Sequence, residues 1–209
     1  MTSATEVSVA GLDVSRETLA ALQQYEDLVR RWTPAINLVS KATLPDLWDR
    51  HIVDSAQIFA LCPFSATSWA DLGSGGGFPG VVIAILAKQL KPDLRVTLVE
   101  SDLRKATFLR QAAQTLALPV TVRSSRIEVL DPLNAEVISA RALAPLADLL
   151  AYADRHLAAG GVAVFPKGAR YAEELAEAQK TWAFDVDAQQ SLSDADAAIL
   201  VIRNIHRHD

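Results

Sequence analysis

The sequence contains a single cysteine, Cys62, among its 209 residues. One cysteine cannot form a disulfide within the chain or supply the several thiolates of a structural zinc site, which excludes disulfide-stapled and zinc-cysteine folds. Long apolar runs are also missing. The longest, from Val81 to Ala87, is far shorter than the roughly 20 residues of a membrane-spanning helix. The first residues lack the basic-then-apolar order of a secretory signal. We therefore expect a cytoplasmic protein that binds neither a membrane nor a metal.

Basic residues are fewer than acidic ones: 20 Lys and Arg stand against 25 Asp and Glu, for a net charge of −5. A chain of this charge is not a general polyanion binder, so a contact with nucleic acid must use a local basic patch. Half of the residues are hydrophobic and 22% are charged, a composition that suits one compact core and argues against disorder or a coiled coil. We expect one globular protein, and we predict a monomer.

The first third of the sequence predicts two helices. Apolar residues recur at three- and four-residue spacings between Ser15 and Trp32, with Ser15 as the cap and Pro34 past the end. A second helix is expected from about Pro45 to Leu61, and Cys62-Pro63 follows it. From residue 67 onward, short apolar runs alternate with amphipathic stretches. We therefore predict a helical extension over residues 1–66 and an α/β core over residues 67–209.

The core is predicted to contain seven strands and four helices. The strands are expected at Ser68–Leu72, Leu94–Glu100, Val120–Arg123, Glu136–Ala140, Val162–Pro166, Phe184–Gln189 and Ala197–Asn204. The helices are expected at Pro79–Leu90, Asp102–Leu116, Pro145–Leu157 and Ala169–Trp182. Only Ser191–Asp196 separates the last two strands, which is too short for a parallel crossover. The prediction is a mostly parallel, Rossmann-like sheet that ends in an antiparallel pair.

A glycine-rich turn joins the first core strand to its helix, with the sequence Asp71-Leu72-Gly73-Ser74-Gly75-Gly76-Gly77-Phe78-Pro79-Gly80. Glycine permits positive φ and a close approach of a ligand to the backbone, and a helix start offers unpaired N–H groups. Glu100 ends the next strand, where a carboxylate can accept hydrogen bonds from both ribose hydroxyls. We predict a nucleoside-binding loop.

Two ligand classes fit this loop. Gly75, Gly77 and Gly80 satisfy the dinucleotide pattern, which leaves an NAD(P)-dependent oxidoreductase open. The register Asp71-x-Gly73-x-Gly75-x-Gly77, the bulk of Phe78 and the antiparallel sheet ending favour S-adenosylmethionine, and this combination resembles the class I methyltransferases. Asp71 is then expected to meet a cationic ligand. A non-catalytic adenosine-nucleotide-binding protein on a ribosomal partner is the third possibility.

Other polar residues follow strand ends or lie on the second helix. The segment Ser124 to Glu128 follows the third strand and either bonds an adenine edge or is an ordinary loop with Arg126 paired to Glu128. Arg50 and Asp54, four residues apart, fit an ion pair across one helical turn. Arg141 and Lys167 follow the fourth and fifth strands. They either reach a ligand or phosphate at that rim or are solvated surface groups.

Taken together, these motifs resemble the RsmG (GidB) family of bacterial small-subunit ribosomal RNA guanine-N-7 methyltransferases. The resemblance runs from about residue 20 to the C-terminus. It rests on the glycine loop with Phe78-Pro79-Gly80, Asn37-Leu38, Arg50-His51-x-x-Asp54-Ser55, Arg104-Lys105 with Phe108-Leu109-Arg110, and Ser139-Ala140-Arg141-Ala142.

The resemblance implies a class I methyltransferase fold, S-adenosylmethionine as donor without a metal, and as acceptor a guanine at position 527, in the 530 loop of 16S rRNA in the small ribosomal subunit. It implies a donor pocket of Gly73, Phe78, Ile127, Glu128 and Arg141, to which the loop pattern adds Asp71, Gly75 and Glu100. Arg141 is also the candidate catalytic residue. Asn37, Arg50, His51 and Lys167 are the candidate RNA-binding residues.

Guanine nitrogen 7 has an in-plane lone pair and no proton, so its methylation needs alignment and no general base. The sequence lacks the Asp/Asn-Pro-Pro-aromatic motif typical of adenine amino-group methyltransferases. Its one cysteine precedes its proline, unlike the nucleophile of cytosine-carbon methyltransferases. A carboxylate facing the site, from Asp71 or Glu128, is expected to favour the positive charge that passes to the purine.

Overall fold

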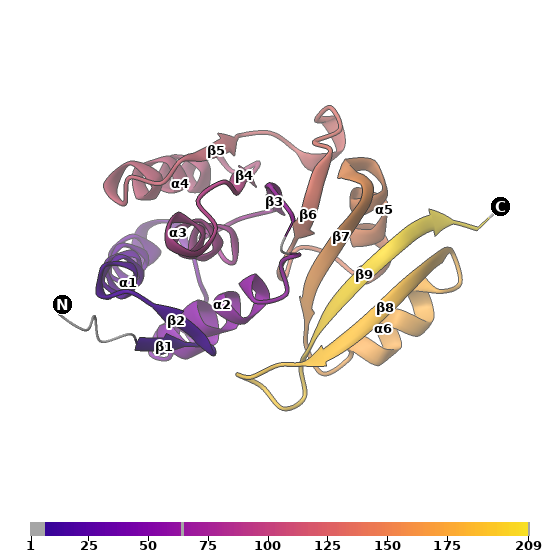
Figure 1. Ribbon diagram of the computed structural model, residues 1–209, viewed down its shortest axis with the longest axis horizontal. Helices are drawn as coiled ribbons and strands as arrows, with labels where there is room; N and C mark the ends of the chain where they lie inside the picture. Colours follow the sequence, from indigo (N-terminus) through magenta and orange to yellow (C-terminus); the bar gives the residue numbers. More distant parts are fainter. Residues whose placement is uncertain (1–6, 64, 209) are drawn as a thin grey trace.

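The computed structural model describes residues 7–63 and 65–208, and a seven-stranded sheet forms its centre (Figure 1). The strand order is β5-β4-β3-β6-β7-β9-β8. The first five of these strands run parallel, and β9 pairs antiparallel with both β7 and β8. The predicted Rossmann-like sheet with an antiparallel end is confirmed. The strands are β3 (Ser68–Leu72), β4 (Arg95–Val99), β5 (Val120–Arg123), β6 (Ala135–Ser139), β7 (Leu157–Lys167), β8 (Trp182–Gln190) and β9 (Ala198–Arg207).

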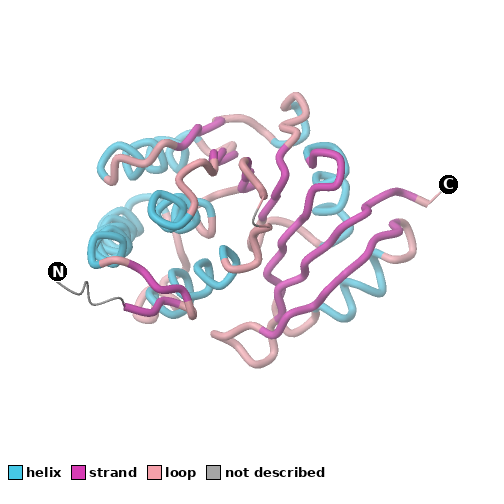
Figure 2. Tube along the Cα trace, viewed as in Figure 1, coloured by secondary structure: helices cyan, strands magenta, loops and turns pink. Residues whose placement is uncertain are grey.

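Helices cover both faces of this sheet (Figure 2). Neighbouring strand residues point to opposite faces, so Trp69 joins one hydrophobic cluster while Ala70 joins the other. The four core helices lie close to where the sequence predicts them. On the first face lie α3 (Gly80–Leu90) and α4 (Leu103–Thr115), and on the second lie α5 (Leu146–His156) and α6 (Tyr171–Ala178).

The N-terminal segment packs on the first face. Its main helix, α1 (Arg16–Ile36), begins at Ser15, whose side chain accepts the Thr18 N–H as predicted. The expectation that the helix ends before Pro34 is wrong, because Pro34 lies within it. Pro34 lacks one N–H, but Ile36 beyond it still packs against the core, and Asn37 caps the helix in the left-handed conformation.

Two further features differ from the sequence-based expectation. A hairpin of β1 (Val7–Val9) and β2 (Leu12–Val14) precedes α1, in a segment expected to be helical only. The second helix starts at Trp48, and its first part, η1 (Trp48–Val53), is a π-helix that continues into α2 (Asp54–Phe59). Leu22, Ile52 and Phe108 belong to one hydrophobic cluster, so the N-terminal elements share a core with α4. The division near residue 66 stays a prediction.

The strand β7 begins earlier than Val162, the start that the sequence predicts. Its register with β6 shifts between Ala135 and Val137, and Gly160, at φ 73°, lies in this irregular stretch. Residues Leu157–Gly161 therefore belong to the strand through a bulge that a pattern search takes for a break.

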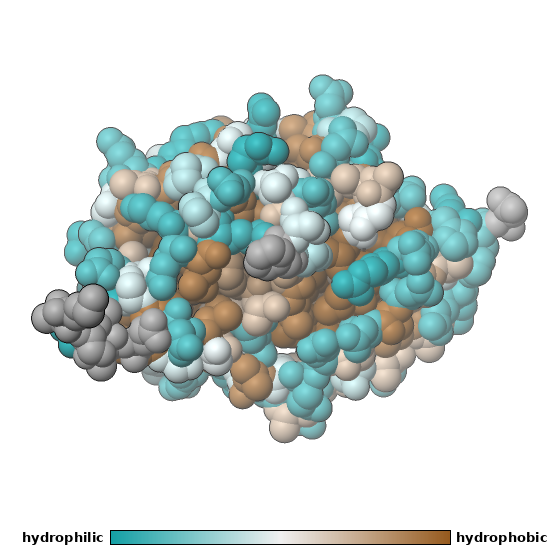
Figure 3. Space-filling model, in the orientation of Figure 1, coloured by the Kyte–Doolittle hydropathy of each residue, from teal (hydrophilic) through white to brown (hydrophobic). Residues whose placement is uncertain are grey.

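On the face shown in Figure 3, hydrophobic side chains gather in the middle and hydrophilic ones surround them. Within the described part of the chain, no helix is both long and apolar enough to cross a membrane.

Candidate active site

The glycine loop runs from the end of β3 to the start of α3. Gly73, Gly75 and Gly77 all have positive φ, at 65°, 55° and 88°. A Cβ on Gly77 would collide with the hydroxyl of Tyr25 and with Val81. The loop is tied to the next strand by the Ser74 N–H, which donates to the Val99 carbonyl at 2.9 Å. Glycine is required here by both conformation and space.

Asp71 lies beneath this loop and only 1% of it is exposed. Its carboxylate accepts the Ser139 hydroxyl at 2.7 Å and the Gly80 N–H at 3.1 Å. Burial raises the pKa of Asp71 to about 6, against the opposing effect of these hydrogen bonds. The sequence analysis expects Asp71 to meet the ligand. The structure instead places it behind the cavity, where it holds the start of α3 against β3.

Tyr25 on α1 supports the loop from the other side. Its hydroxyl donates to the Gly76 carbonyl, and its ring lies 5.2 Å from the ring of Phe78. Burial raises the pKa of Tyr25 well above its usual value, so the hydroxyl keeps its proton. The sequence analysis counts Tyr25 only as part of an apolar helix face. A buried phenol on such a face needs a hydrogen-bond partner, and this need could have indicated from the sequence that Tyr25 contacts another segment.

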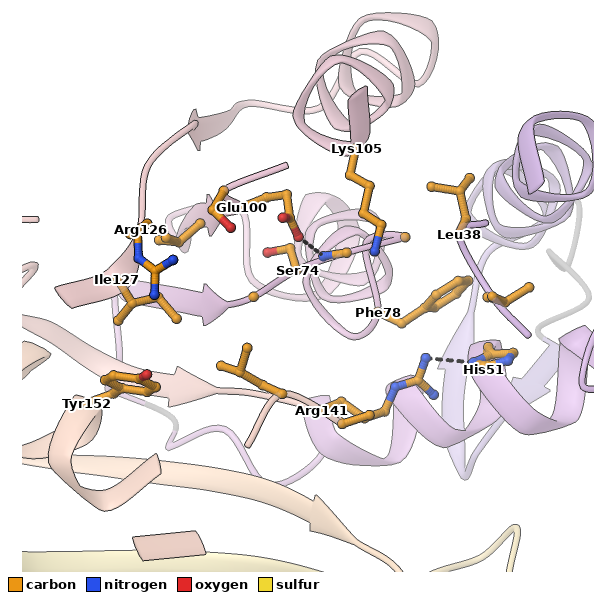
Figure 4. Close-up of a pocket in the computed structure, with 18 of the residues that line it drawn as sticks. Leu38, His51, Ser74, Phe78, Glu100, Lys105, Arg126, Ile127, Arg141 and Tyr152 are labelled. Atoms are coloured by element: carbon orange, nitrogen blue, oxygen red, sulfur yellow. Dashed lines mark hydrogen bonds between the residues drawn. The ribbon is translucent and has the colours of Figure 1, made fainter. Parts of the chain in front are cut away.

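A first cavity, of ≈ 700 Å³, opens above the glycine loop. It brings together eight of the predicted residues: His51, Gly73, Gly75, Phe78, Glu100, Ile127, Glu128 and Arg141. Figure 4 shows Phe78, His51 and Arg141 at one end, Ile127 and Tyr152 at the other, and Glu100 and Lys105 between them. The sequence analysis names Leu38 and Lys105 only as residues of the family motifs and misses Ser40, Thr43 and Tyr152, and all five line the cavity.

Glu100 is fixed by two backbone groups. One carboxylate oxygen accepts the Gly75 N–H at 2.8 Å, and the other accepts the Asp102 N–H at 2.7 Å. A carboxylate oxygen accepts more than one hydrogen bond, so both oxygens retain capacity for a ligand in the first cavity. The residue therefore links the glycine loop to the start of α4 and presents acceptors to the ligand.

The segment after β5 forms the far wall. Ile127 is buried in the short helix η2 (Ile127–Val129). Glu128 accepts the Tyr152 hydroxyl at 3.0 Å and pairs with Arg126 at 3.4 Å. Its own backbone N–H and the Tyr152 hydroxyl lower the pKa of Glu128. The predicted pair of Arg126 with Glu128 is confirmed, and both residues also line the cavity, whereas the contact of this segment with an adenine edge stays a prediction.

Arg141 lies between the first cavity and a second, neighbouring cavity that is described below. Its guanidinium donates to the Asp54 carboxylate at 3.3 Å, to the Arg50 carbonyl at 3.2 Å and to His51 Nδ1 at 2.6 Å. It also lies 5.2 Å from the centre of the Phe78 ring. Arg141 is thus not a solvated surface group. Asp54, 87 residues away in sequence, is its charge partner.

His51 is neutral in this arrangement. Burial is the first cause that lowers the pKa of His51 to about 3, and the charges of Arg141 and Arg50 add to it. Because Nδ1 accepts from Arg141, the ring proton lies on Nε2, which is 3.0 Å from Thr43 Oγ1. Its ring also packs 5.0 Å from that of Phe78.

A second cavity, of ≈ 500 Å³, shares Arg141, Ala142 and Leu143 with the first. Lys167 lines it, but its buried ammonium donates to the Ala144 carbonyl at 3.0 Å and to Glu174 at 2.7 Å. The other members of the lining include Arg50, Asp54, Ser191, Ser193 and Asp194.

The remaining candidate RNA-binding residues, Asn37 and Arg50, are exposed to solvent. Arg50 is exposed and pairs with Asp194 at 3.6 Å, so the predicted pair with Asp54 across one helical turn is wrong. Asn37 is the exposed cap of α1 and lines neither of these two cavities.

The first cavity fits S-adenosylmethionine. A Cβ built on Gly75 meets only the Gly73 carbonyl oxygen, at 3.7 Å, so a ligand can approach the backbone there. Glu100 offers acceptors to ribose hydroxyls, and Ile127 offers an apolar surface to a purine. Among residues 7–63 and 65–208, no group of three or more His, Cys, Asp or Glu side chains is arranged to hold a metal ion.

Comparison with solved structures supports the fold. An O-methyltransferase, TomG from Streptomyces achromogenes, in complex with SAM, superposes with a TM-score of 0.60 at 14% identity, covering 88% of this chain and 89% of that one. A methyltransferase from Geobacter sulfurreducens gives a TM-score of 0.58 at 14% identity, covering 92% and 90%. Several of these neighbours are named as SAM-dependent or SAM-bound methyltransferases, and the likeness shows that the chain shares their fold. The dinucleotide and non-catalytic hypotheses are not favoured, because the sequence relatives are named as methyltransferases.

Comparison of sequences gives the family. The model of the GidB family, rRNA small subunit methyltransferase G, matches residues 18–204. The ribosomal RNA small subunit methyltransferase G of Ruegeria sp. (strain TM1040) is 50% identical over 94% of this chain and 95% of its own length. That of Cereibacter sphaeroides (strain ATCC 17025 / ATH 2.4.3) is 54% identical over 92% of each. With matches of this extent, the chain belongs to the GidB family of rRNA small subunit methyltransferases G.

Proposed function

We propose that the chain methylates ring nitrogen 7 of a guanine in 16S rRNA, at position 527 in the 530 loop, with S-adenosylmethionine as donor. Family membership supports small-subunit rRNA as the acceptor. The observation that carries the proposal is the wall of Arg141, Ala142 and Leu143, which the two cavities share. Because the cavities share these residues they are neighbours, so a donor in the first and a base that enters from the second would approach each other at this wall.

When bound, S-adenosylmethionine supplies a sulfonium-bound methyl group, whose carbon–sulfur bond breaks as the carbon–nitrogen bond to the acceptor forms, leaving S-adenosylhomocysteine. The protein groups suit an acceptor that carries a lone pair and no proton. His51 is the one histidine among the described residues that line the two cavities, and both its ring nitrogens are engaged. Glu100 and Glu128 are held by hydrogen bonds from Gly75, Asp102 and Tyr152, which suits carboxylates that position a ligand. A ring nitrogen with a free lone pair needs no group that removes a proton, so these residues need only align it.

The residues of the site therefore act by alignment, for which effective molarities correspond to ~7–11 kcal/mol at best. Glu100 and Ile127 hold the nucleoside part of the donor, and the glycine loop admits it to the backbone. Arg141, fixed in the shared wall, orients the two reactants. Arg50 lines the second cavity and is exposed, which supports a contact between its guanidinium and RNA phosphate.

The test is methyl transfer from a labelled donor to small ribosomal subunits purified from cells that lack the modification. We expect label in the 530 loop, recovered as 7-methylguanine. Subunits from unmodified and modified cells form the matched pair, because the latter already carry the methyl group. Absence of label from the unmodified subunits, or label at another atom or another loop, would overturn the proposal.

A further inference from the structure

Asp54 and Arg141 form an ion pair inside the wall between the two cavities. Their side chains are only 17% and 16% exposed, and the carboxylate oxygen lies 3.3 Å from the guanidinium nitrogen. Burial lowers the pKa of Arg141, and the charge of Asp54 is the first effect that opposes this. A single charge of either sign at this depth is costly, and the pair removes that cost.

Asp54 is itself held in place. Its other carboxylate oxygen accepts the Gln57 side-chain amide at 2.8 Å and the Ser193 hydroxyl at 2.9 Å. Ser193 belongs to the loop between β8 and β9, so three separate parts of the chain fix this carboxylate. Asp54 lines the second cavity and not the first, where Arg141 is exposed to a ligand.

The charges that line the first cavity do not balance. Three cations and two carboxylates line it, which leaves one positive charge in excess: Lys105, Arg126 and Arg141 against Glu100 and Glu128. His51 adds none, because it is neutral. Two carboxylates behind the wall act on Arg141. Of these, Asp71 already accepts the hydrogen bonds of Ser139 and Gly80, whereas Asp54 contacts the guanidinium directly.

A sulfonium donor is a poor ligand for a wall with excess positive charge. S-adenosylmethionine and its product, S-adenosylhomocysteine, share the adenosine, the amino group and the carboxylate, and differ by one methyl group and one positive charge. We propose that Asp54 is a positioning residue that neutralises Arg141, so that the first cavity accepts the donor with its sulfonium charge as well as the product, which lacks that charge. This inference rests on the proposed use of S-adenosylmethionine.

The test is the ratio of the dissociation constants of S-adenosylmethionine and S-adenosylhomocysteine, measured by calorimetry on the whole chain. Contacts that both ligands share cancel in this ratio. In Asp54→Asn, which keeps the shape but loses the charge, we expect the ratio to shift against the donor by roughly tenfold, the order of effect of one uncompensated charge in the lining of the same cavity at an effective dielectric constant of about 20. Asp194→Asn, an acid of the second cavity paired with Arg50, is the control and should leave the ratio unchanged.

Two further variants test the direction in which the charge of Arg141 shifts the ratio of dissociation constants. Arg141→Gln removes the cation and leaves Asp54, so the ratio should shift toward the donor. The double variant Asp54→Asn with Arg141→Gln should return the ratio to within about twofold of the original value. These two variants decide the matter if Asp54→Asn alone does not fold, which circular dichroism reports.

An unchanged ratio in Asp54→Asn, with both ligands weakened alike, would show that Asp54 is structural only and would overturn the inference. A shift of the ratio against the donor in Arg141→Gln would also overturn the inference. Failure of the unsubstituted chain to bind either ligand is a different outcome, since it overturns the proposed donor itself.

Discussion

Gly75 is the position in the candidate site where a side chain can be introduced to test whether the glycine loop binds the donor. It has φ 55°, its N–H donates to Glu100, and a Cβ there has room. We expect Gly75→Asp to weaken donor binding by at least about tenfold, because the new side chain fills the space through which the ligand reaches the backbone and its charge repels Glu100 from the Gly75 N–H; these losses oppose the attraction of a carboxylate for the sulfonium. The strain of a side chain at this φ should cost the fold only about 1 kcal/mol.

The matched variant is Gly75→Asn, which has the same shape and tolerates this backbone conformation but carries no charge. Calorimetry gives the affinity and urea unfolding gives the stability. Equal donor affinity in the glycine, asparagine and aspartate forms would mean that the loop is only a turn.

Asp71 predicts a pH dependence of stability. The pKa of its carboxyl is about 6 in the folded protein, against its usual 3.8. Between these values the folded state binds more protons than the unfolded state, so the contribution of Asp71 to stability falls as the pH rises from about 4 to about 6. In Asp71→Asn this contribution is absent. The free energy of unfolding of the variant, relative to the original protein, should therefore rise by about 2–3 kcal/mol between pH 4 and pH 7.

Urea unfolding of both proteins at a series of pH values measures this difference. Ser139→Ala, which removes the hydroxyl that donates to Asp71, should raise the folded pKa further and move the change to higher pH. A difference that stays flat from pH 4 to pH 7 would contradict the assignment.

At the scale of elements, Pro34 inside α1 offers a stability test. Proline cannot donate to the Arg30 carbonyl, and the residue is exposed, so no packing compensates at that position. We expect Pro34→Ala to raise the free energy of unfolding by about 1 kcal/mol, the gain in helix propensity less the greater entropy of the unfolded chain. Pro34→Gly restores the N–H without the propensity and should gain less. A loss of stability in Pro34→Ala would show that the proline supports the cap at Asn37.

The elements that the sequence predicts well are those whose signals are local. Strands β3, β4 and β6 are short apolar runs between breakers, and the short connection before β9 fixes its antiparallel direction. The hairpin β1–β2 escapes prediction because its strands have three residues each and Ala10 takes a positive φ that alanine rarely adopts. The π-helix before α2 escapes because a change in helical period over six residues leaves no clear trace in the spacing.

The candidate site also has parts that the sequence predicts and parts that it does not. The glycine loop and Glu100 are predictable, because the turn and the end of the next parallel strand lie at one edge of the sheet. The ion pair of Asp54 with Arg141 is not, because Arg50 is a nearer partner along the sequence while the true partner lies 87 residues away. Tertiary packing, not local pattern, decides which charges meet.

For the whole molecule, the charge of −5 predicts a preference for a folded acceptor. An acidic protein gains little from phosphate contacts in general and depends on the shape of the presented base. We expect methyl transfer to intact small subunits to be at least about tenfold faster than to protein-free 16S rRNA at physiological salt. Because phosphate contacts contribute little to this preference, repeating the comparison at low salt should leave the gap largely unchanged. Equal rates at physiological salt would show that recognition of the RNA does not require the folded small subunit.

The place of β9 between β7 and β8 ties the assembly of the sheet to the order of synthesis. A growing polypeptide that has been made only as far as β8 has no partner strand to join β8 to β7. Ser193, which fixes Asp54, also leaves the exit tunnel just before β9 does. A nascent chain therefore completes the wall that holds Arg141 only as β9 emerges, and a translation product that stops short of β9 lacks a finished site.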